Sequence, residues 1–374
     1  MLTINRYIAS SGYDRIKCWG NPVALPVGSM VIVLVQKLLI KATDCFSDLS
    51  ILRSSDGGKS WSTPEKVAHL AGFTDADGIR HAYLASSMRH CADGKILVML
   101  TTFNYNQQNR LDRTHPQRVN YLYFDPANGS WSEIRELELD APANADVLAV
   151  DSQLVEIDGD YLLPYCVREE SSKFHSRIAK IRISDDGTLT PVDYSEKIET
   201  SIGRGFLEPS LCRFAGKYYL TLRNDQTGYL GVSDDWKSFS AIKSLCFTDG
   251  SDLGNYNTMT RLLPIGNKLF LVYTRKGLNN DHIFRHRAPL MIGEVDPELA
   301  AIIRGSEQIA VPEHGARLGN FTAAVSPENY GYISVAEWMQ TLEPERDNSL
   351  KCEEYGSDNR IWFVTLKTSS DQKE

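Results

Sequence analysis

A tight glycine turn between two apolar runs recurs six times along the chain and limits the folds that are open to it. Each turn joins a short apolar segment to a second run rich in aromatic and β-branched residues, as in CADGKILVML and RFAGKYYLTL. Glycine allows the positive φ that a tight hairpin requires. The six turn glycines are Gly28, Gly94, Gly159, Gly216, Gly266 and Gly331. Their spacings of 66, 65, 57, 50 and 65 residues suit four-stranded units with loops.

Each hairpin is followed by a further pair of strand-like segments, such as DLSILRSS, NYLYFDP and RIWFVTL. The repeat therefore predicts an all-β fold, a single six-bladed β-propeller over residues 1–374. We expect the blades near residues 20–70, 80–140, 145–200, 205–248, 255–312 and 319–367. The first run, LTINRYIAS, is left over, and we expect it to add a strand to the last blade. A large β-sandwich is the alternative, but the evenly repeated hairpins favour the propeller.

Charge and composition argue against several classes of protein. A net charge of −8 argues against a nucleic-acid partner, and the most apolar run, residues 31–40, is too short to span a membrane. The N-terminus MLTINRYIAS has no signal-like apolar core, so we expect a cytoplasmic protein, although a secreted protein without its leader would look the same. Seven scattered cysteines without a CxxC pair predict free thiols rather than disulfides. The oligomeric state is left open.

Neither a metal nor a cofactor is expected. The cysteines lack the paired spacing of a zinc site. The histidine pair four residues apart, His282 and His286, is expected on a loop rather than on one face of a helix.

Residues 54–61 read SSDGGKSW and match the pattern S-x-D-x-G-x-[ST]-W, the Asp-box or BNR repeat of sialidase-like propellers. Degenerate copies begin at Asp125, Ser184 and Ser233, at the same place in successive blades. Serine and aspartate side chains of this pattern cap turn amides, and the tryptophan packs between blades. We therefore expect Asp56 and Trp61 to stabilise the fold and to lie away from any active site.

On these motifs the chain resembles the sialidases, or neuraminidases, over most of its length. The resemblance implies that Arg15 in DRIK, Arg223 in LTLR and Arg287 in HRAPL would together hold a substrate carboxylate. It also implies that Glu208 in FLEPS pairs with Arg223, and that Asp44, ten residues before the Asp-box serine, is the acid/base candidate. The family's tyrosine nucleophile has no counterpart, because residues 318–322 read LGNFT. The chain thus resembles a divergent member of the family.

Strand register makes an independent prediction of the site. The hairpin glycines mark one end of the propeller, so residues about eight positions before and seven to nine after each glycine face the opposite end. These positions are Asn21, Ser86, Asp151, Glu208 and Asn257 on first strands, and Arg168, Arg223, Arg275 and Glu337 on second strands. Arginines that converge with carboxylates and amides suit an anionic sugar. The alternative is that these residues form ion pairs between blades.

Three functions fit these observations. The first is an exo-acting glycoside hydrolase for a carboxylated sugar, with Asp44 as acid/base and Glu208 as base or water activator; direct inversion would need the carboxyl groups about 6.5–9.5 Å apart. The second is a lyase that cleaves a uronic-acid glycoside such as rhamnosyl-glucuronate by β-elimination, with His81 as the base. His286, which flanks Arg287 in the sequence, is a further candidate for binding the substrate. The third is a propeller that only binds glycans. The expected partner in each case is an acidic oligosaccharide or glycan.

Overall fold

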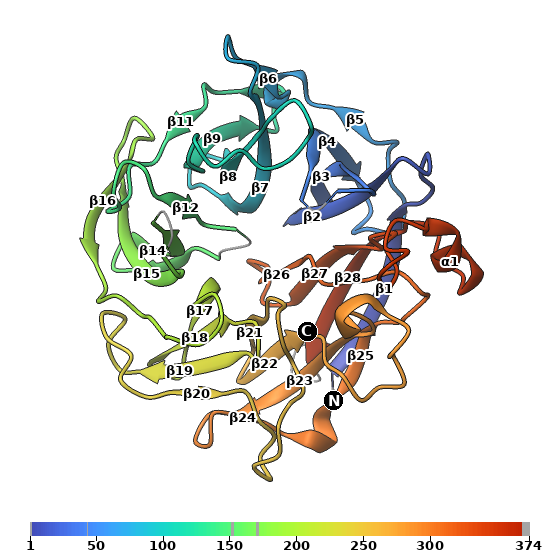
Figure 1. Cartoon of the computed structure of the whole chain (residues 1–374). Helices are drawn as coiled ribbons and strands as arrows, with labels where there is room; N and C mark the ends of the chain where they lie inside the picture. Colours follow the sequence, from blue (N-terminus) through green and yellow to red (C-terminus); the bar gives the residue numbers. More distant parts are fainter. Residues whose placement is uncertain (1, 43, 151–152, 170–171, 369–374) are drawn as a thin grey trace.

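The computed structural model describes residues 2–42, 44–150, 153–169 and 172–368. Six antiparallel sheets stand around a central axis, with β2, β7, β12, β17, β21 and β26 nearest the centre (Figure 1). The predicted all-β, six-bladed propeller is thus confirmed.

The first three blades follow one another along the chain. Blade one contains β2 (Lys17–Val27), β3 (Met30–Leu39), β4 (Phe46–Ser54) and β5 (Glu65–Lys66). Blade two contains β6 (Phe73–Thr74), β7 (Arg80–His90), β8 (Ile96–Tyr105), β9 (Val119–Asp125), β10 (Ser130–Trp131) and β11 (Arg135–Glu136). Blade three contains β12 (Asp146–Leu148), β13 (Val155–Ile157), β14 (Asp160–Arg168), β15 (His175–Ile183) and β16 (Leu189–Tyr194).

The last three blades complete the ring. Blade four contains β17 (Leu207–Phe214), β18 (Lys217–Arg223), β19 (Tyr229–Ser233) and β20 (Ile242–Ser244). Blade five contains β21 (Arg261–Ile265), β22 (Lys268–Tyr273), β23 (Leu290–Asp296), β24 (Ala301–Ile302) and β25 (Gln308–Val311). Blade six contains β26 (Phe321–Val325), β27 (Gly331–Ala336), β28 (Ile361–Thr368) and β1 (Leu2–Ser10).

The N-terminal strand closes the ring as expected. β1 pairs antiparallel with β28, from Leu2 opposite Thr368 to Ser10 opposite Ile361 (Figure 1). The last blade therefore takes its outer strand from the start of the chain and its other three strands from the end. Closure of this kind protects an edge that would otherwise expose unpaired backbone groups.

The hairpin between the first two long strands of each blade fixes the direction of the inner strand. In blade one, for example, Gly28 has a φ of 61° between β2 and β3. Each inner strand runs toward its hairpin, so its first residues and the ends of the second strands lie at the opposite end of the propeller. We call this opposite end the mouth.

Apolar side chains fill the spaces between neighbouring blades. One buried cluster joins Val23 and Leu34 of blade one to Val98 and Leu122 of blade two. Side chains of each strand point alternately to its two faces, so each sheet can contact both of its neighbours. This packing fixes the positions of the blades relative to one another.

Helical structure is limited to short segments in loops. These are α1 (Ser349–Glu354) between β27 and β28, and the 3-10 turns η1 (Ala68–Leu70), η2 (Phe284–His286) and η3 (Arg304–Ser306). No helix in the described part of the chain has the length and apolar character needed to cross a bilayer. All seven cysteines lie within the described ranges and are free thiols.

The turn formed by residues 54–61 lies between β4 and β5 on the outer side of blade one. Asp56 accepts hydrogen bonds from the backbone amides of Lys59 and Ser60 at 3.0 and 2.9 Å. The Trp61 ring packs edge-on against Phe363 of blade six, with the ring centroids 5.7 Å apart. The turn therefore ties a loop of blade one to the neighbouring blade.

Candidate functional site

Unusual backbone conformations occur at the mouth, as they do in turns elsewhere in the propeller. Several residues there have φ between 45° and 62°, a region that is sterically unfavourable for residues other than glycine. They are Arg15, Asn21, Asp44, Glu208, Asn257, Arg285 and His286. In two of the inner strands the unusual residue coincides with a bulge, at Asn21 between Gly20 and Val23 and at Glu208 between Leu207 and Ser210. Bulges re-aim side chains and occur frequently next to active sites.

Glu208, Arg223 and Asn257 form the centre of the cluster. Arg223 lies at the end of β18 and donates to Glu208 Oε1 at 2.5 Å and to Asn257 Oδ1 at 2.8 Å. The two charged side chains are only 12% and 16% exposed. Glu208 Oε2 and Arg223 Nε are buried and have no hydrogen-bond partner among the described residues. The structure thus brings together the three residues that strand register placed at the mouth of blades four and five.

Arg287 joins this centre from the loop that precedes β23. Its guanidinium donates to the backbone carbonyl of Asn257, and a second bond of 3.4 Å reaches Asn320 Oδ1. Asn320 in turn donates to Asn21 Oδ1 at 3.2 Å. Gly319 makes the approach possible, because a Cβ atom there would lie 2.2 Å from Arg287 Cδ.

Arg317 is a second buried arginine at the mouth and was not among the residues expected from the sequence. Its guanidinium stacks 3.5 Å from the ring centroid of Trp338. Burial is the largest effect on this residue and lowers the pKa of Arg317 to about 9, against the opposing charge of Asp44. A clue was present in the sequence, since Arg317 stands four residues before the inner strand of blade six.

The cluster carries more positive than negative charge. Burial lowers the pKa of Arg287 well below its usual value, and the charges of Arg223 and Arg317 lower it further. Neither Arg287 nor Arg317 forms an ion pair with a described carboxylate, and the Nε atom of each is buried without a hydrogen-bond partner there. Buried cations of this kind are costly unless an anion accompanies them.

Glu208 remains a carboxylate in this setting. Burial acts to raise its pKa, but the charge of Arg223 and its hydrogen bond outweigh burial, and Arg287 adds to the effect. The net result is a pKa of Glu208 below the usual value. A buried carboxylate that keeps its charge can accept hydrogen bonds and can orient a water or hydroxyl group.

Asp44 approaches the same cluster from the loop between β3 and β4. Its negative charge is among the influences that raise the pKa values of Arg223 and Arg317. Its backbone carbonyl is held by the hydroxyl of Tyr105 at 2.5 Å. Its carboxylate forms no hydrogen bond or ion pair with any described residue. The structure therefore brings a second, unengaged carboxylate to the arginine cluster.

A tyrosine–histidine pair stands beside the arginines. The hydroxyl of Tyr256 lies 2.6 Å from His286 Nδ1, and His286 Nε2 lies 3.2 Å from Asp281 Oδ1. His286 was expected at the mouth from the sequence, whereas Tyr256 was not singled out. Tyr256 directly precedes Asn257 in the chain. Its place next to Asn257, which strand register predicts at the mouth, is the sequence signal that pointed to Tyr256.

Two of the expected arginines have acidic partners outside the Arg223 cluster. Arg15 pairs with Glu353 of α1 at 3.1 Å, with 65% of its side chain exposed, and no contact joins it to the Arg223 cluster. Arg168 at the end of β14 is ion-paired with Asp146 and lies over the ring of Phe174. Each of these arginines therefore has an acidic partner of its own in this structure.

Glu337, one of the expected acidic residues, has partners outside the Arg223 cluster. Glu337 is buried in blade six, where it accepts hydrogen bonds from the backbone amides of Asp358 and Arg360 at 3.0 Å and from the side chain of Arg360 at 3.2 Å. Its carboxylate oxygens therefore accept hydrogen bonds from the loop that precedes β28 and help to hold that loop in place. Asp151 lies outside the described residues.

His81 belongs to a separate polar group in blade two. Its Nδ1 lies 2.8 Å from Asn104 Oδ1, and its Nε2 lies 2.9 Å from Asp75 Oδ2. The amide nitrogen of Asn104 donates to the carbonyls of His115 and Pro116, so its oxygen is the atom that faces His81. Both ring nitrogens therefore face acceptors. Asn104 and Asp75 thus engage His81 within blade two.

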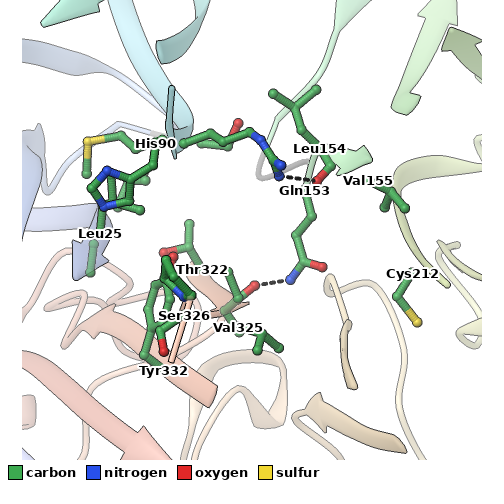
Figure 2. Close-up of a pocket in the computed structure, with 18 of the residues that line it drawn as sticks. Leu25, His90, Gln153, Leu154, Val155, Cys212, Thr322, Val325, Ser326 and Tyr332 are labelled. Carbon is green, nitrogen blue, oxygen red and sulfur yellow. Dashed lines mark hydrogen bonds between the residues drawn. The ribbon is translucent and has the colours of Figure 1, made fainter. Parts of the chain in front are cut away.

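A cavity of about 430 Å³ lies along the axis on the hairpin side of the cluster. Figure 2 shows its lining, with Leu25 and His90 on one side and Gln153, Leu154 and Val155 across from them. Most of the lining is apolar, and the buried arginines of the mouth take no part in it. The cavity is therefore distinct from the candidate site.

Known structures resemble the whole chain. A sialidase from Trypanosoma rangeli in complex with the inhibitor DANA superposes with a TM-score of 0.60 at 12% identity, over 95% of this chain and 56% of the sialidase. The NanB sialidase from Streptococcus pneumoniae gives 0.59 at 11% identity, over 97% of this chain and 70% of that one. The chain has the sialidase-like propeller fold. It spans a little over half the length of the trypanosomal sialidase.

No protein-family profile and no curated protein sequence matches the chain. The similarity therefore lies in the fold of this sialidase-like propeller rather than in its sequence. Within the described ranges, no group of three or more His, Cys, Asp or Glu side chains is arranged to hold a metal ion.

Proposed function

We propose that the propeller is an exo-acting glycoside hydrolase that removes a carboxylated sugar at its mouth. One observation carries the proposal. Arg287 and Arg317 are each 3% exposed, and neither has a described carboxylate partner, although Arg223 with its own carboxylate, Glu208, stands beside them. An anionic ligand would supply the missing negative charge.

The chemistry of arginine favours a carboxylate as that anion. A guanidinium presents its donors in a planar fork that matches the two oxygens of a carboxylate. Charge-assisted hydrogen bonds of this kind are stronger in a site that excludes water. The carboxylate would orient the sugar, and Asn257 would hold two of the arginines in place through its side-chain and backbone oxygens.

Two carboxylates stand where the sugar would bind. Glu208 stays ionised and keeps one oxygen free of protein hydrogen bonds, so we assign it the activation of a water or the binding of a hydroxyl. Asp44 is the carboxylate candidate for transferring a proton to or from the leaving oxygen. A pair of carboxyl groups is the usual machinery for hydrolysis of a glycosidic bond.

The alternative of β-elimination by His81 has less support. A catalytic base needs an available lone pair within reach of the proton. Asn104 and Asp75 engage His81 within blade two, and no contact among the described residues joins it to the arginine cluster. A propeller that only binds glycans remains a second alternative, which a turnover assay would separate from the hydrolase.

Sialosides are the first substrates to test. The sialidase from Trypanosoma rangeli, which shares this fold, binds the inhibitor DANA in one structure and sialic acid in another. A β-glucuronide offers a second carboxylated sugar of smaller size. The pair covers a sialic acid and a uronic acid.

The test compares each acidic glycoside with its carboxyl-reduced analogue by release of a fluorescent aglycone. We expect turnover of at least one acidic glycoside and a much lower kcat/KM for its reduced analogue. Equal rates on both would contradict the carboxylate assignment. An unsaturated uronate among the products, seen by its ultraviolet absorbance, would show elimination in place of hydrolysis. Binding without turnover would indicate a glycan-binding propeller.

A further inference from the structure

A chain of hydrogen bonds leads from the arginine cluster to solvent. Tyr256 is half-buried, and its hydroxyl lies 2.6 Å from His286 Nδ1. The far side of the same imidazole, Nε2, lies 3.2 Å from Asp281 Oδ1. The side chain of His286 is 25% exposed and that of Asp281 is 95% exposed. A proton could therefore pass between the mouth and bulk water through these three residues.

The hydroxyl of Tyr256 belongs to the candidate site rather than to the surface around it. Burial raises its pKa, and the positive charges of Arg285 and Arg287 oppose that rise. The residue also directly precedes Asn257, which binds Arg223 through its side chain and Arg287 through its carbonyl. The balance keeps the phenol protonated, so it is a donor placed among groups that attract an anion.

The loop that carries His286 is held in an unusual conformation. Arg285 and His286 are consecutive residues with φ values of 56° and 51°. The buried amide of Asn280 donates to the carbonyl of Ala288 at 2.6 Å and to that of Arg275 at 3.0 Å, which pins both ends of the loop. Two adjacent left-handed residues cost energy, and such costs are typical of functional sites.

We propose that Tyr256 is the proton donor to the leaving oxygen and that His286 resupplies it. The inference rests on the proposed hydrolase function. As a water molecule adds to the anomeric carbon and gives a proton to Glu208, the glycosidic C–O bond breaks. The electron pair of that bond goes to the leaving oxygen, which takes the proton of the Tyr256 hydroxyl. A proton on His286 Nδ1 then moves to the phenolate oxygen. Solvent returns a proton to His286 while its Nε2–H faces Asp281.

This assignment makes Tyr256 the catalytic acid and His286 a positioning residue that reloads it. Asp44 is the competing donor, because its carboxylate is also free at the mouth. The two candidates approach from different blades, Asp44 from blade one and Tyr256 from the loop before β21 in blade five. Single substitutions can therefore test them separately.

The experiment exploits the need of the leaving group for a proton. An alkoxide leaving group requires one, whereas 2,4-dinitrophenolate departs without it. For Tyr256→Phe we expect kcat/KM on an alkyl glycoside of the acidic sugar to fall by about 10²- to 10⁴-fold, the range for general acid catalysis, and that on the dinitrophenyl glycoside by less than about tenfold. His286→Gln should show the same selectivity to a smaller extent.

Several outcomes decide the matter. Equal losses on both glycosides, or no loss on either, would overturn the role of Tyr256 while leaving the hydrolase function intact. Selectivity for the leaving group in Asp44→Asn in place of Tyr256→Phe would assign the donor to Asp44. Failure of the unaltered protein to cleave either glycoside would overturn both proposals together. Thermal unfolding of each variant identifies misfolded protein, and His286→Gln provides a second test if Tyr256→Phe does not fold.

Discussion

Arg223 donates to one oxygen of Glu208 at 2.5 Å, while the other oxygen of Glu208 is buried and accepts no hydrogen bond within the described part of the chain. Buried polar atoms usually have partners, because an unsatisfied one costs free energy. The half-satisfied carboxylate therefore stands ready for a ligand hydroxyl or a water. Its position beside Arg223 and Arg287 links the charge balance of the mouth to the chemistry proposed for it.

Glu208→Gln tests whether this carboxylate takes part in the chemical step. The amide keeps the shape of the side chain but removes the charge that balances Arg223, so we expect a loss of stability of about 3–5 kcal/mol. If Glu208 activates water, kcat should fall by at least about 10²-fold with a smaller change in KM.

Glu307→Gln is the matched control, because Glu307 is equally buried and pairs with Arg275 at 2.9 Å. It should destabilise the protein without a comparable loss of kcat. If Glu208→Gln raises KM and leaves kcat unchanged, Glu208 binds a hydroxyl of the substrate and takes no part in the chemical step.

Arg223→Lys tests whether the planar guanidinium of Arg223 recognises the carboxylate of the substrate. A lysine keeps the charge but cannot bind Glu208, Asn257 and a ligand with one geometry. We expect kcat/KM on the acidic glycoside to fall by an amount equivalent to about 2–5 kcal/mol, and a clearly smaller fall on the carboxyl-reduced analogue. Arg182→Lys, at an exposed ion pair with Asp160, is the control and should leave both rates unchanged. An equal fall in kcat/KM on the two substrates would show that Arg223 does not recognise the carboxylate.

Gly319→Ala tests the placement of Arg287 without altering any charged group. A Cβ atom at residue 319 would lie 2.2 Å from Arg287 Cδ and 2.8 Å from its Nε, so the arginine must move. Charge-assisted bonds depend on geometry, and we expect the affinity for the acidic ligand to fall at least about tenfold. Gly305→Ala adds the same methyl group where nothing lies within 4 Å, and it should bind as the unaltered protein does. Calorimetric titration with the free acidic sugar measures both variants.

The fold could be predicted from the sequence because its determinants are local and repeated. In five blades the hairpin glycine takes the positive φ of the turn, whereas in blade six Asn329 does so at 61° and Gly331 begins β27. The leftover run at residues 2–10 had one open edge to fill. The same local register placed Glu208, Arg223 and Asn257 correctly relative to one another. Residues on paired strands inherit their positions from the pairing, which a repeat reveals.

The rest of the site depends on contacts between distant segments. Arg15 turns to Glu353, which lies 338 residues away in the sequence, and the pattern DRIK contains no sign of that partner. Arg317 and Tyr256 lie in loops, where no strand alternation marks a side chain as inward-facing. Glu337 occupies a register position at the mouth, yet its oxygens are taken by the backbone of residues 358 and 360. Register predicts where a residue stands but not which partner its side chain finds.

Asp56→Asn tests the turn of blade one through its pH dependence. Hydrogen bonds from Ser60 and Ser54 hold the pKa of Asp56 well below its usual value. A carboxylate with a depressed folded-state pKa stabilises the protein above its unfolded-state pKa of about 3.9, and that contribution is lost as pH falls further. We therefore expect Asp56→Asn to lower the Tm at neutral pH, and the difference from the unaltered protein to shrink below about pH 4.

Two observations check the Asp56 prediction. Asp185→Asn changes an exposed aspartate in the equivalent turn of blade three and should leave the Tm unchanged at every pH. Activity per folded molecule should be the same for both variants, because the turn lies on the outer side of the blade. A large loss of turnover in Asp56→Asn with an unaltered Tm would place this aspartate in the active site instead.

Arg317→Met separates the stability of the empty site from its function. Burial lowers the pKa of Arg317 to about 9, so at pH 7 the guanidinium is charged in both folded and unfolded states and its burial opposes folding. Methionine fills the same space beside Trp338 without that cost. By analogy with buried ionic groups replaced by apolar ones, we expect the ligand-free protein to gain about 1–4 kcal/mol in stability and to lose affinity for the acidic sugar.

The matched change Arg275→Met should lower the stability of the protein, because it leaves the buried carboxylate of Glu307 without its arginine. Denaturant unfolding with and without the sugar measures both effects; an Arg317→Met protein that is less stable when empty would mean that the stacking on Trp338 outweighs the buried charge.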